Sequence, residues 1–197
     1  MKPYLKRAWA EISLSALEAN IRAISASLQG NTQIMAVVKA DAYGHGEAEI
    51  LQKLTQIGIR YFAVSNLDEA LHVRQYCPDS DVLILGYTPP EYADTLAQNN
   101  IIQGIVSAEY ACTLNARTRT PIRCHVKLDT GMGRIGITGD TPGDCADSIQ
   151  DMSFLRNLKI EGIYTHFAVA DMPDDPEQNA YTEAQKQFIR SVGTELM

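Results

Sequence analysis

No run in the 197 residues approaches the ~20 apolar positions that a helix needs to span a bilayer. Residues 1–7 carry positive charge, but no apolar stretch follows them, which excludes an ordinary secretion signal. We therefore expect a cytoplasmic protein without a membrane segment in this chain, although a longer parent could carry an anchor.

Clustered basic residues, paired cysteines and paired histidines are also missing. The 17 Lys and Arg residues are scattered and the formal net charge is −7, which argues against a nucleic-acid-binding surface. The four cysteines form no C-x-x-C pair and are too widely spaced for a disulfide framework. The four histidines lack the i, i+4 pairing or nearby cysteine of a typical zinc site, so we expect no metal.

The chain does contain enough apolar residues, 45%, for one sizeable core. Short apolar runs predict strands at residues 34–38, 61–65, 82–85, 101–106, 124–128 and 158–165. Helical spacing predicts helices at 13–28, 47–57, 67–76, 91–98, after Ser107, around 141–152 and at 181–192. Ser15 and Glu18 match a capping box in the first helix, and residues 172–176 read as an acidic loop.

Apolar strands that alternate with helices imply a parallel sheet covered on both faces, either a wound sheet or a barrel. A TIM barrel has eight strands and typically ~250 residues. With six predicted strands, the sequence predicts an α/β fold of the (β/α)8-barrel type that stops about two strand–helix units short.

The first segment whose residues could take part in catalysis is AVVKADAYGHG, residues 36–46. It places Lys39 at the carboxyl end of a predicted buried strand, the end at which barrel active sites gather. An amine there could form a Schiff base with an aldehyde cofactor and then accept a substrate proton, and Tyr43 could donate to a phosphate. On position alone, a lysine that extends from a strand end into solvent is the commoner explanation.

Two later segments also follow predicted strands. KLDTGMGRIGI, residues 127–137, sets three glycines beside Arg134, whose fixed fork suits a carboxylate, although a tight loop with a surface arginine would look the same. GIYTHFAVAD, residues 162–171, places His166 at a strand end, where a histidine is usually just a hydrogen-bonded side chain.

These three segments, in this order, resemble the motifs of the alanine racemase family, whose barrels are the fold-type III class of pyridoxal-phosphate enzymes. Residues 7–12 and 82–86 are similar to the family's opening strand and third barrel strand, so the resemblance runs from about Arg7 onward. It implies that pyridoxal 5'-phosphate is the cofactor. It also implies that residues 1–12 are an opening strand that pairs within a C-terminal β domain absent here, and that residues 13–197 are a partial cofactor-binding barrel.

The resemblance implies a role for each matching side chain. Lys39 would form the Schiff base and act as one of two catalytic bases, and Tyr43 would contact the cofactor phosphate. Arg134 would contact the phenolic oxygen of the cofactor and the second catalytic tyrosine, and a carbamylated Lys127 would orient that arginine. Two further residues would touch the cofactor: Leu85, and His166, whose ring would pack against the pyridine.

By resemblance, the parent protein interconverts L- and D-alanine for bacterial peptidoglycan and works as a homodimer whose active sites draw on both subunits. A serine racemase of the vancomycin-resistance type, which residues 87–90 faintly resemble, stays open. So do a non-catalytic pyridoxal-phosphate-binding barrel and a structural remnant that binds nothing. The family's opposite-face tyrosine, its arginine to the pyridine nitrogen and its usual phosphate site have no counterpart here. We therefore expect a part of a longer racemase, with little reason to expect racemisation by the part alone.

Overall fold

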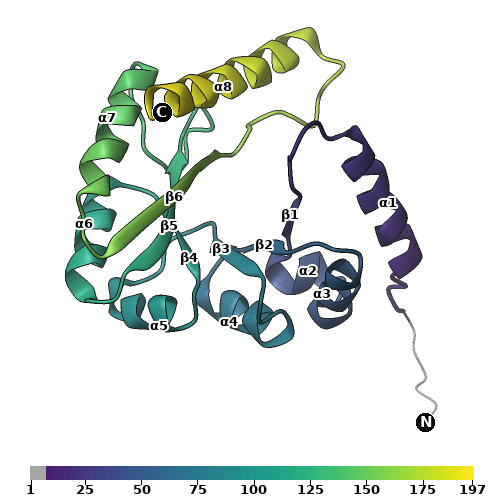
Figure 1. Cartoon of the computed structure of the whole chain (residues 1–197). Helices are drawn as coiled ribbons and strands as arrows, with labels where there is room; N and C mark the ends of the chain where they lie inside the picture. The colour runs from purple at the N-terminus through teal and green to yellow at the C-terminus, as the bar shows by residue number, and fades with distance from the viewer. Residues whose placement is uncertain (1–7) are drawn as a thin grey trace.

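The computed structural model describes residues 8–197, which form one curved parallel sheet with helices around its outer side (Figure 1). The strands are β1 (Met35–Val37), β2 (Tyr61–Val64), β3 (Asp81–Ile84), β4 (Ile102–Ile105), β5 (Ile122–Leu128) and β6 (Leu158–Thr165). The helices are α1 (Leu14–Ser27), α2 (Lys39–Gly44), α3 (Glu47–Gln56), α4 (Leu67–Tyr76), η1 (Pro90–Tyr92), α5 (Ala93–Gln98), α6 (Ala108–Arg117), α7 (Pro142–Ser153) and α8 (Pro176–Glu195).

The strand order shows that the sheet is of the barrel type and not a doubly wound sheet. Each strand pairs in parallel with the next one in sequence, from β1 to β6. A doubly wound sheet reverses its order at a switch point, whereas a barrel never does. Because right-handed crossovers in one direction place all helices on one side, the helices cover only the convex face (Figure 1). The expectation of helices on both faces was therefore wrong.

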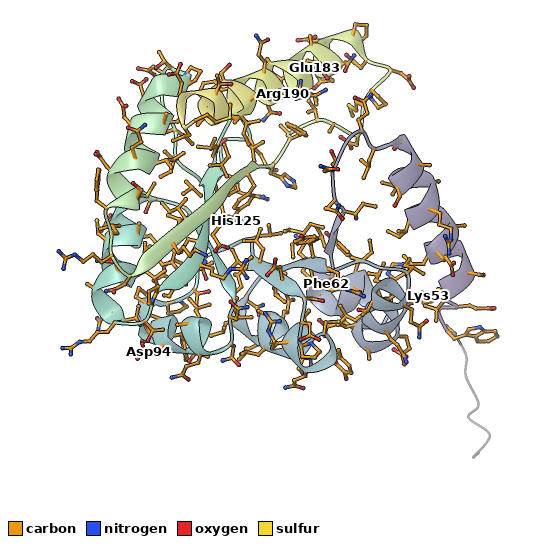
Figure 2. All side chains as sticks on the ribbon, in the orientation of Figure 1. Lys53, Phe62, Asp94, His125, Glu183 and Arg190 are labelled. Atoms are coloured by element: carbon orange, nitrogen blue, oxygen red, sulfur yellow. The ribbon has the colours of Figure 1, made fainter. Side chains whose placement is uncertain are left out.

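The core lies between the sheet and these outer helices. Phe62 of β2 is fully buried there, in the region labelled in Figure 2. The concave face carries a much smaller apolar cluster, formed by Ala63, Leu83 and Ile102. Near the amino ends of the strands it also carries charge, since Arg123 donates to Asp81 at 2.5 Å and to Glu161 at 2.6 Å.

Most predicted elements agree with the structure within two residues, and α4 and β6 agree at both ends. α8 is longer than predicted: it begins at Pro176, inside the predicted acidic loop, because Asp175 accepts from two amides of its first turn. The segment after Pro89 is one 3-10 turn before α5 begins. The predicted capping box in α1 was wrong, because Ser13 is the N-cap and Glu18 instead pairs with Arg22 and with Lys53 of α3 (Figure 2).

One prediction for the start of the chain stays a prediction, and one was wrong. Residues 8–13 form no strand in this structure and Arg7 lies outside the described residues, so the expected pairing of residues 1–12 with a C-terminal β domain is not tested. β1 was predicted to be buried, yet Val37 is 41% exposed. The reason is that β1 has a hydrogen-bonded neighbour only on its β2 side in the described sheet, and its inner side faces the open concave surface. No helix within residues 8–197 is long and apolar enough to cross a membrane.

Candidate active site

A cavity of about 270 Å³ opens where the strands end at their carboxyl side. All six side chains predicted from the sequence line it, although they come from segments up to 127 residues apart: Lys39, Tyr43, Leu85, Lys127, Arg134 and His166. The remaining lining residues are Met35, Val37, Ala63, Leu83, Ile135, Tyr164 and Thr165. The fold therefore gathers the three sequence motifs into one site.

Lys39 stands at the start of an unusual turn. The four residues after it, Ala40 to Tyr43, have φ between 51° and 57°, so α2 is a left-handed turn rather than an α-helix. This conformation costs roughly 1–2 kcal/mol for each residue with a Cβ, and none of the four is glycine. The turn brings the Lys39 amine to 5.8 Å from the centre of the Tyr43 ring, and both side chains face the cavity.

The loop after β5 is organised by Asp129. Its carboxylate accepts hydrogen bonds from the amides of Gly131, Gly133 and Arg134, at 3.1, 2.9 and 2.7 Å. The loop then returns to the strand, because Ile137 donates its amide to the Lys127 carbonyl at 2.8 Å. These bonds fix the backbone on both sides of Arg134.

Lys127 is only 3% exposed, and its amine donates to the Ile135 carbonyl at 2.9 Å. Burial lowers the pKa of this amine, the Asp129 carboxylate opposes that shift, and the Arg134 cation adds to it. A buried amine whose pKa is lowered is more often neutral, which is the form that reacts with carbon dioxide or an aldehyde.

α8 holds the end of β6 in place through the buried side chain of Gln185. Its amide donates to the Thr130 hydroxyl at 3.1 Å, and its carbonyl oxygen accepts from the Ala168 amide at 3.0 Å. Thr130 also shares a hydrogen bond of 2.8 Å with the Thr165 hydroxyl. One buried amide thus joins the Arg134 loop to the segment that carries His166.

The cavity is rich in basic side chains. Its lining includes Lys39, Lys127, Arg134 and His166, and none of the described residues that line it is acidic. Partial burial lowers the pKa of His166, and the three cations lower it further. Such a site favours a ligand that carries negative charge, and its apolar wall suits a flat ring.

The sequence motifs did not identify the wall of the cavity. Met35 and Val37 of β1 lie four and two positions before Lys39, and Tyr164 of β6 lies two positions before His166. Since side chains two positions apart share one face of a strand, this spacing could have identified them. The Tyr164 hydroxyl donates to the Leu85 carbonyl at 3.0 Å, in space that Gly104 leaves free: a Cβ on Gly104 would lie 2.5 Å from that hydroxyl.

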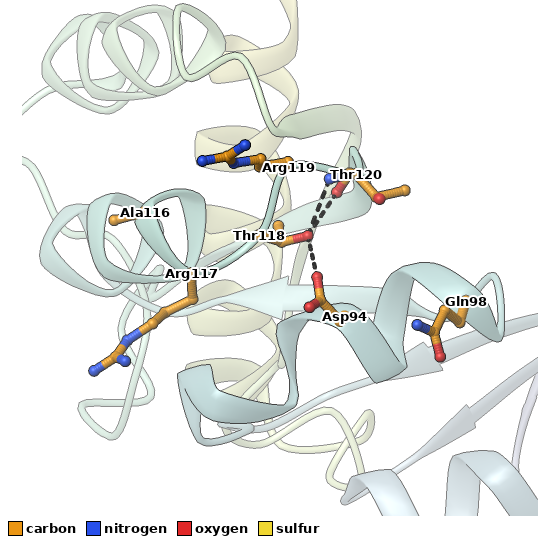
Figure 3. Close-up of a pocket in the computed structure, with 7 residues that line it drawn as sticks. All are labelled: Asp94, Gln98, Ala116, Arg117, Thr118, Arg119 and Thr120. Atoms are coloured by element: carbon orange, nitrogen blue, oxygen red, sulfur yellow. Dashed lines mark hydrogen bonds between the residues drawn. The ribbon is translucent and has the colours of Figure 1, made fainter.

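A second cavity lies at the opposite end of the strands, between α5 and the loop from α6 to β5 (Figure 3). There Thr118 donates to Asp94 at 2.6 Å, which holds the loop against α5. Arg117 and Arg119 point away from Asp94 in Figure 3 and do not converge on a common point. This arrangement explains the loop's position and provides no focus for an anion.

Comparison with known proteins decides which family shares this site. A family model described as the alanine racemase N-terminal domain matches residues 12–196. The chain belongs to the alanine racemase family. It is 41% identical over 191 residues to an amino-acid racemase of Enterococcus faecalis and 40% identical over 192 residues to a serine/alanine racemase of Enterococcus gallinarum. Its fold matches an alanine racemase of Clostridium difficile with a TM-score of 0.85 at 32% identity.

The chain spans only part of the length of these alanine racemase relatives. The two enterococcal matches cover 97% and 98% of this chain but 26% of each relative, and the structural match covers 98% of this chain and 50% of the solved one. The six strands described above are thus the family's barrel-like N-terminal part.

The lining residues fit pyridoxal phosphate, the cofactor expected from the resemblance to alanine racemases. The cofactor carries an aldehyde, an anionic phosphate and a flat aromatic ring. The cavity offers an amine on Lys39, cations without an acidic lining residue, and an apolar wall that includes Leu85. This match of donor set and wall comes from the chemistry of the residues present.

Acid should destabilise this alanine racemase domain through two of its histidines. Burial lowers the pKa of His166 and of His125, which lies on β5 (Figure 2), below the ordinary value of 6.5. The unfolded chain then binds these protons first, so the stability is fully present above pH 6.5 and falls as the pH drops towards the folded pKa values. Urea unfolding between pH 7.5 and 5 measures the slope.

The double variant His125→Asn, His166→Asn tests whether these two histidines cause the pH dependence. It should show a shallower loss of unfolding free energy between pH 7 and pH 5 than the unaltered chain. Equal slopes in the two proteins would show that other groups cause the acid sensitivity.

Proposed function

We propose that the protein to which this chain belongs is a pyridoxal-phosphate-dependent amino-acid racemase, with alanine as substrate and Lys39 as the residue that holds the cofactor. The main support is that five side chains from three sequence motifs, together with Leu85 of residues 82–86, line one cavity rich in basic groups. Membership of the alanine racemase family supports the reaction class.

In this proposal, pyridoxal phosphate supplies an aldehyde for the Lys39 amine and an electron sink for the charge that develops at the substrate Cα. Tyr43 binds the phosphate, and Arg134 binds the phenolic oxygen. The apolar contact comes from Leu85, and the imidazole of His166 supports the pyridine ring. The Lys39 amine would remove a proton from the substrate Cα on one face and would return it on that same face.

Inversion needs a second base on the opposite face of Cα. Tyr164 is poorly suited to this role, because burial raises the pKa of its phenol and its hydroxyl donates to the Leu85 carbonyl. Tyr43 is assigned to the phosphate. We therefore propose that the second base comes from outside residues 8–197, in a homodimer whose partner completes each site. By the same family likeness we place the protein in the cytoplasm.

Lys127 is proposed as a carbamylated residue that orients Arg134. Its buried amine has a lowered pKa, which favours reaction with carbon dioxide, and it lies beside the Arg134 loop. The carbamate would place a negative charge next to the guanidinium and hold its direction.

Serine is the alternative substrate, because one relative at 40% identity is a serine/alanine racemase. A single hydroxyl is a small distinction for a pocket, and the polar groups in this lining, among them Tyr43, Thr165 and His166, are not specific to it. Alanine is preferred since the cavity wall near Lys39 is apolar, with Met35, Ala63 and Leu83.

Exchange of the Cα proton tests two of these proposals, that Lys39 is a base and that the second base lies outside residues 8–197. The chain, loaded with pyridoxal phosphate, is incubated with L-alanine in deuterium oxide, and NMR follows the Cα proton while a chiral assay follows D-alanine. We expect deuterium to enter Cα with little inversion, since Lys39 serves one face. Serine in a parallel sample reports the preference between substrates.

Each outcome of the exchange experiment has a separate meaning. Exchange with rapid inversion would show that both bases lie within this chain and contradict the proposed second source. Absence of exchange, with cofactor bound, would contradict the assignment of Lys39 as a base.

A further inference from the structure

The left-handed turn after Lys39 needs something to hold it. Its later part is held by its own surroundings: the Ala42 amide donates to the Val38 carbonyl at 3.0 Å, and the Glu47 amide donates to the Asp41 carboxylate at 2.7 Å. Its first residue, Ala40, has a different partner. The Ala40 amide donates to Oε1 of Glu69 at 2.8 Å, across 29 positions of sequence.

Glu69 lies in the first turn of α4, and its carboxylate is fully engaged. Oε2 accepts from the amide of Ser65 at 2.8 Å and from the hydroxyl of the same residue at 2.7 Å. Burial alone would raise the pKa of this carboxyl, but the interactions with Ala40, Ser65 and the Asn66 backbone lower it, so the group stays anionic. One charged side chain thus joins the ends of two neighbouring strands.

Capping of α4 does not account for this arrangement. Asn66 is the N-cap, and its side chain accepts the Glu69 amide at 3.0 Å. In a capping box, the acidic residue at this position would use one oxygen on the start of its own helix. The second oxygen of Glu69 leaves the helix and reaches the residue that follows Lys39.

We propose that Glu69 is a positioning residue for Lys39: by holding the Ala40 amide, its carboxylate fixes the left-handed turn and the direction in which the lysine amine enters the cavity. The inference rests on the proposed function for its chemical meaning. Its structural content, that the turn depends on Glu69, can be measured without any cofactor.

The test compares three variants of the whole chain: Glu69→Gln, Ser65→Ala and Asp68→Asn. Glu69→Gln keeps the size of the side chain but replaces a charged acceptor by a neutral one. Ser65→Ala removes the hydroxyl that meets Oε2 and leaves the Ala40 contact. Asp68 is an exposed neighbour in the same helical turn and serves as the matched control.

Two measurements are made on each variant. NMR hydrogen exchange reports the Ala40 and Ser65 amides, with the Val126 amide in β5 as an internal reference. Borohydride trapping and mass spectrometry report the rate at which added pyridoxal phosphate reacts with Lys39. Thermal unfolding confirms that the variants are folded.

We expect Glu69→Gln to speed exchange at the Ala40 amide roughly tenfold, because a neutral acceptor holds the amide more weakly than a charged one. Reaction at Lys39 should slow, while Val126 exchange stays unchanged. Ser65→Ala and Asp68→Asn should leave both Ala40 exchange and the Lys39 rate near those of the unaltered chain.

A folded Glu69→Gln protein with unchanged Ala40 exchange, or with an unchanged Lys39 rate, would overturn the positioning role. If Glu69→Gln fails to fold, Ser65→Ala decides: a slower Lys39 rate in that variant, with the Ala40 contact kept, would also overturn it. Failure of the unaltered chain to react at Lys39 is a separate result, because it contradicts the proposed function and leaves the exchange measurement to judge Glu69.

Discussion

Lys39→Ala is expected to abolish the covalent adduct that pyridoxal phosphate forms with this chain. The Lys39 side chain lines the cavity, whereas the other lining amine, on Lys127, is 3% exposed and already donates to the Ile135 carbonyl. Borohydride reduction followed by peptide mass spectrometry locates the adduct, and the absorbance of the bound cofactor reports the same loss. The circular dichroism spectrum should remain unchanged.

The matched control for this experiment is Lys186→Ala. Lys186 is a surface lysine of α8 that pairs with Glu183 (Figure 2), away from the cavity. It should react like the unaltered chain. Adducts spread over several surface lysines, or an adduct that persists in Lys39→Ala, would contradict the assignment of the cofactor to this site.

Gly136→Ala is expected to destabilise the fold more than any other glycine substitution in the Arg134 loop. Gly136 has φ of 133°, and a Cβ there would lie 2.6 Å from the Asp129 amide nitrogen and 3.0 Å from the Lys127 carbonyl. Both are backbone atoms of the contacts that close the loop. Backbone strain and overpacking together cost roughly 3–5 kcal/mol, which lowers the melting temperature by about 10 °C.

Two other glycines make a graded comparison for Gly136. Gly133 has φ of 70° but no atom within 4 Å of a built Cβ, so Gly133→Ala should cost about 1 kcal/mol. Gly193 lies inside α8 with its nearest contact at 4.0 Å, and Gly193→Ala should stabilise the chain by roughly 0.5–1 kcal/mol. Thermal unfolding gives the order, and equal effects at Gly136 and Gly133 would contradict the contact argument.

The barrel could be predicted from the sequence for a simple physical reason, whereas the six site residues were expected from the resemblance to alanine racemases. Apolar strands alternate regularly with helices, and the three motifs that contain most of the candidate site residues include the carboxyl ends of β1, β5 and β6. The carboxyl ends of parallel strands share one edge of a sheet, so residues far apart in sequence meet there. Lys39, Arg134 and His166 are therefore neighbours because of topology rather than local sequence.

The left-handed turn could not be predicted in this way. Ala40, Asp41, Ala42 and Tyr43 carry side chains that disfavour positive φ, and the sequence shows glycine only after them, at Gly44 and Gly46. The conformation depends on partners elsewhere in the chain, among them Glu69. Such a turn is a tertiary feature, and local propensity predicts the wrong backbone for it.

The exposure of β1 was missed for a related reason. Its composition is that of a buried strand, but burial depends on which neighbours cover each face. In residues 8–197, β1 bonds only to β2, and β6 bonds only to β5. Composition predicts the strand, while its position at one end of the sheet determines how much of Val37 meets solvent.

The position of the cavity between the two ends of this sheet has a consequence for cooperativity. Its lining draws Lys39 from the end of β1 and His166 from the end of β6, two strands that are not hydrogen-bonded to each other. A ligand that contacts both side chains connects the two end strands of the sheet. Opening of β1 then requires release of the ligand. When the ligand is bound, hydrogen exchange at the amides of β1 and of β6 should therefore become coupled, and the two strands should open as one cooperative unit.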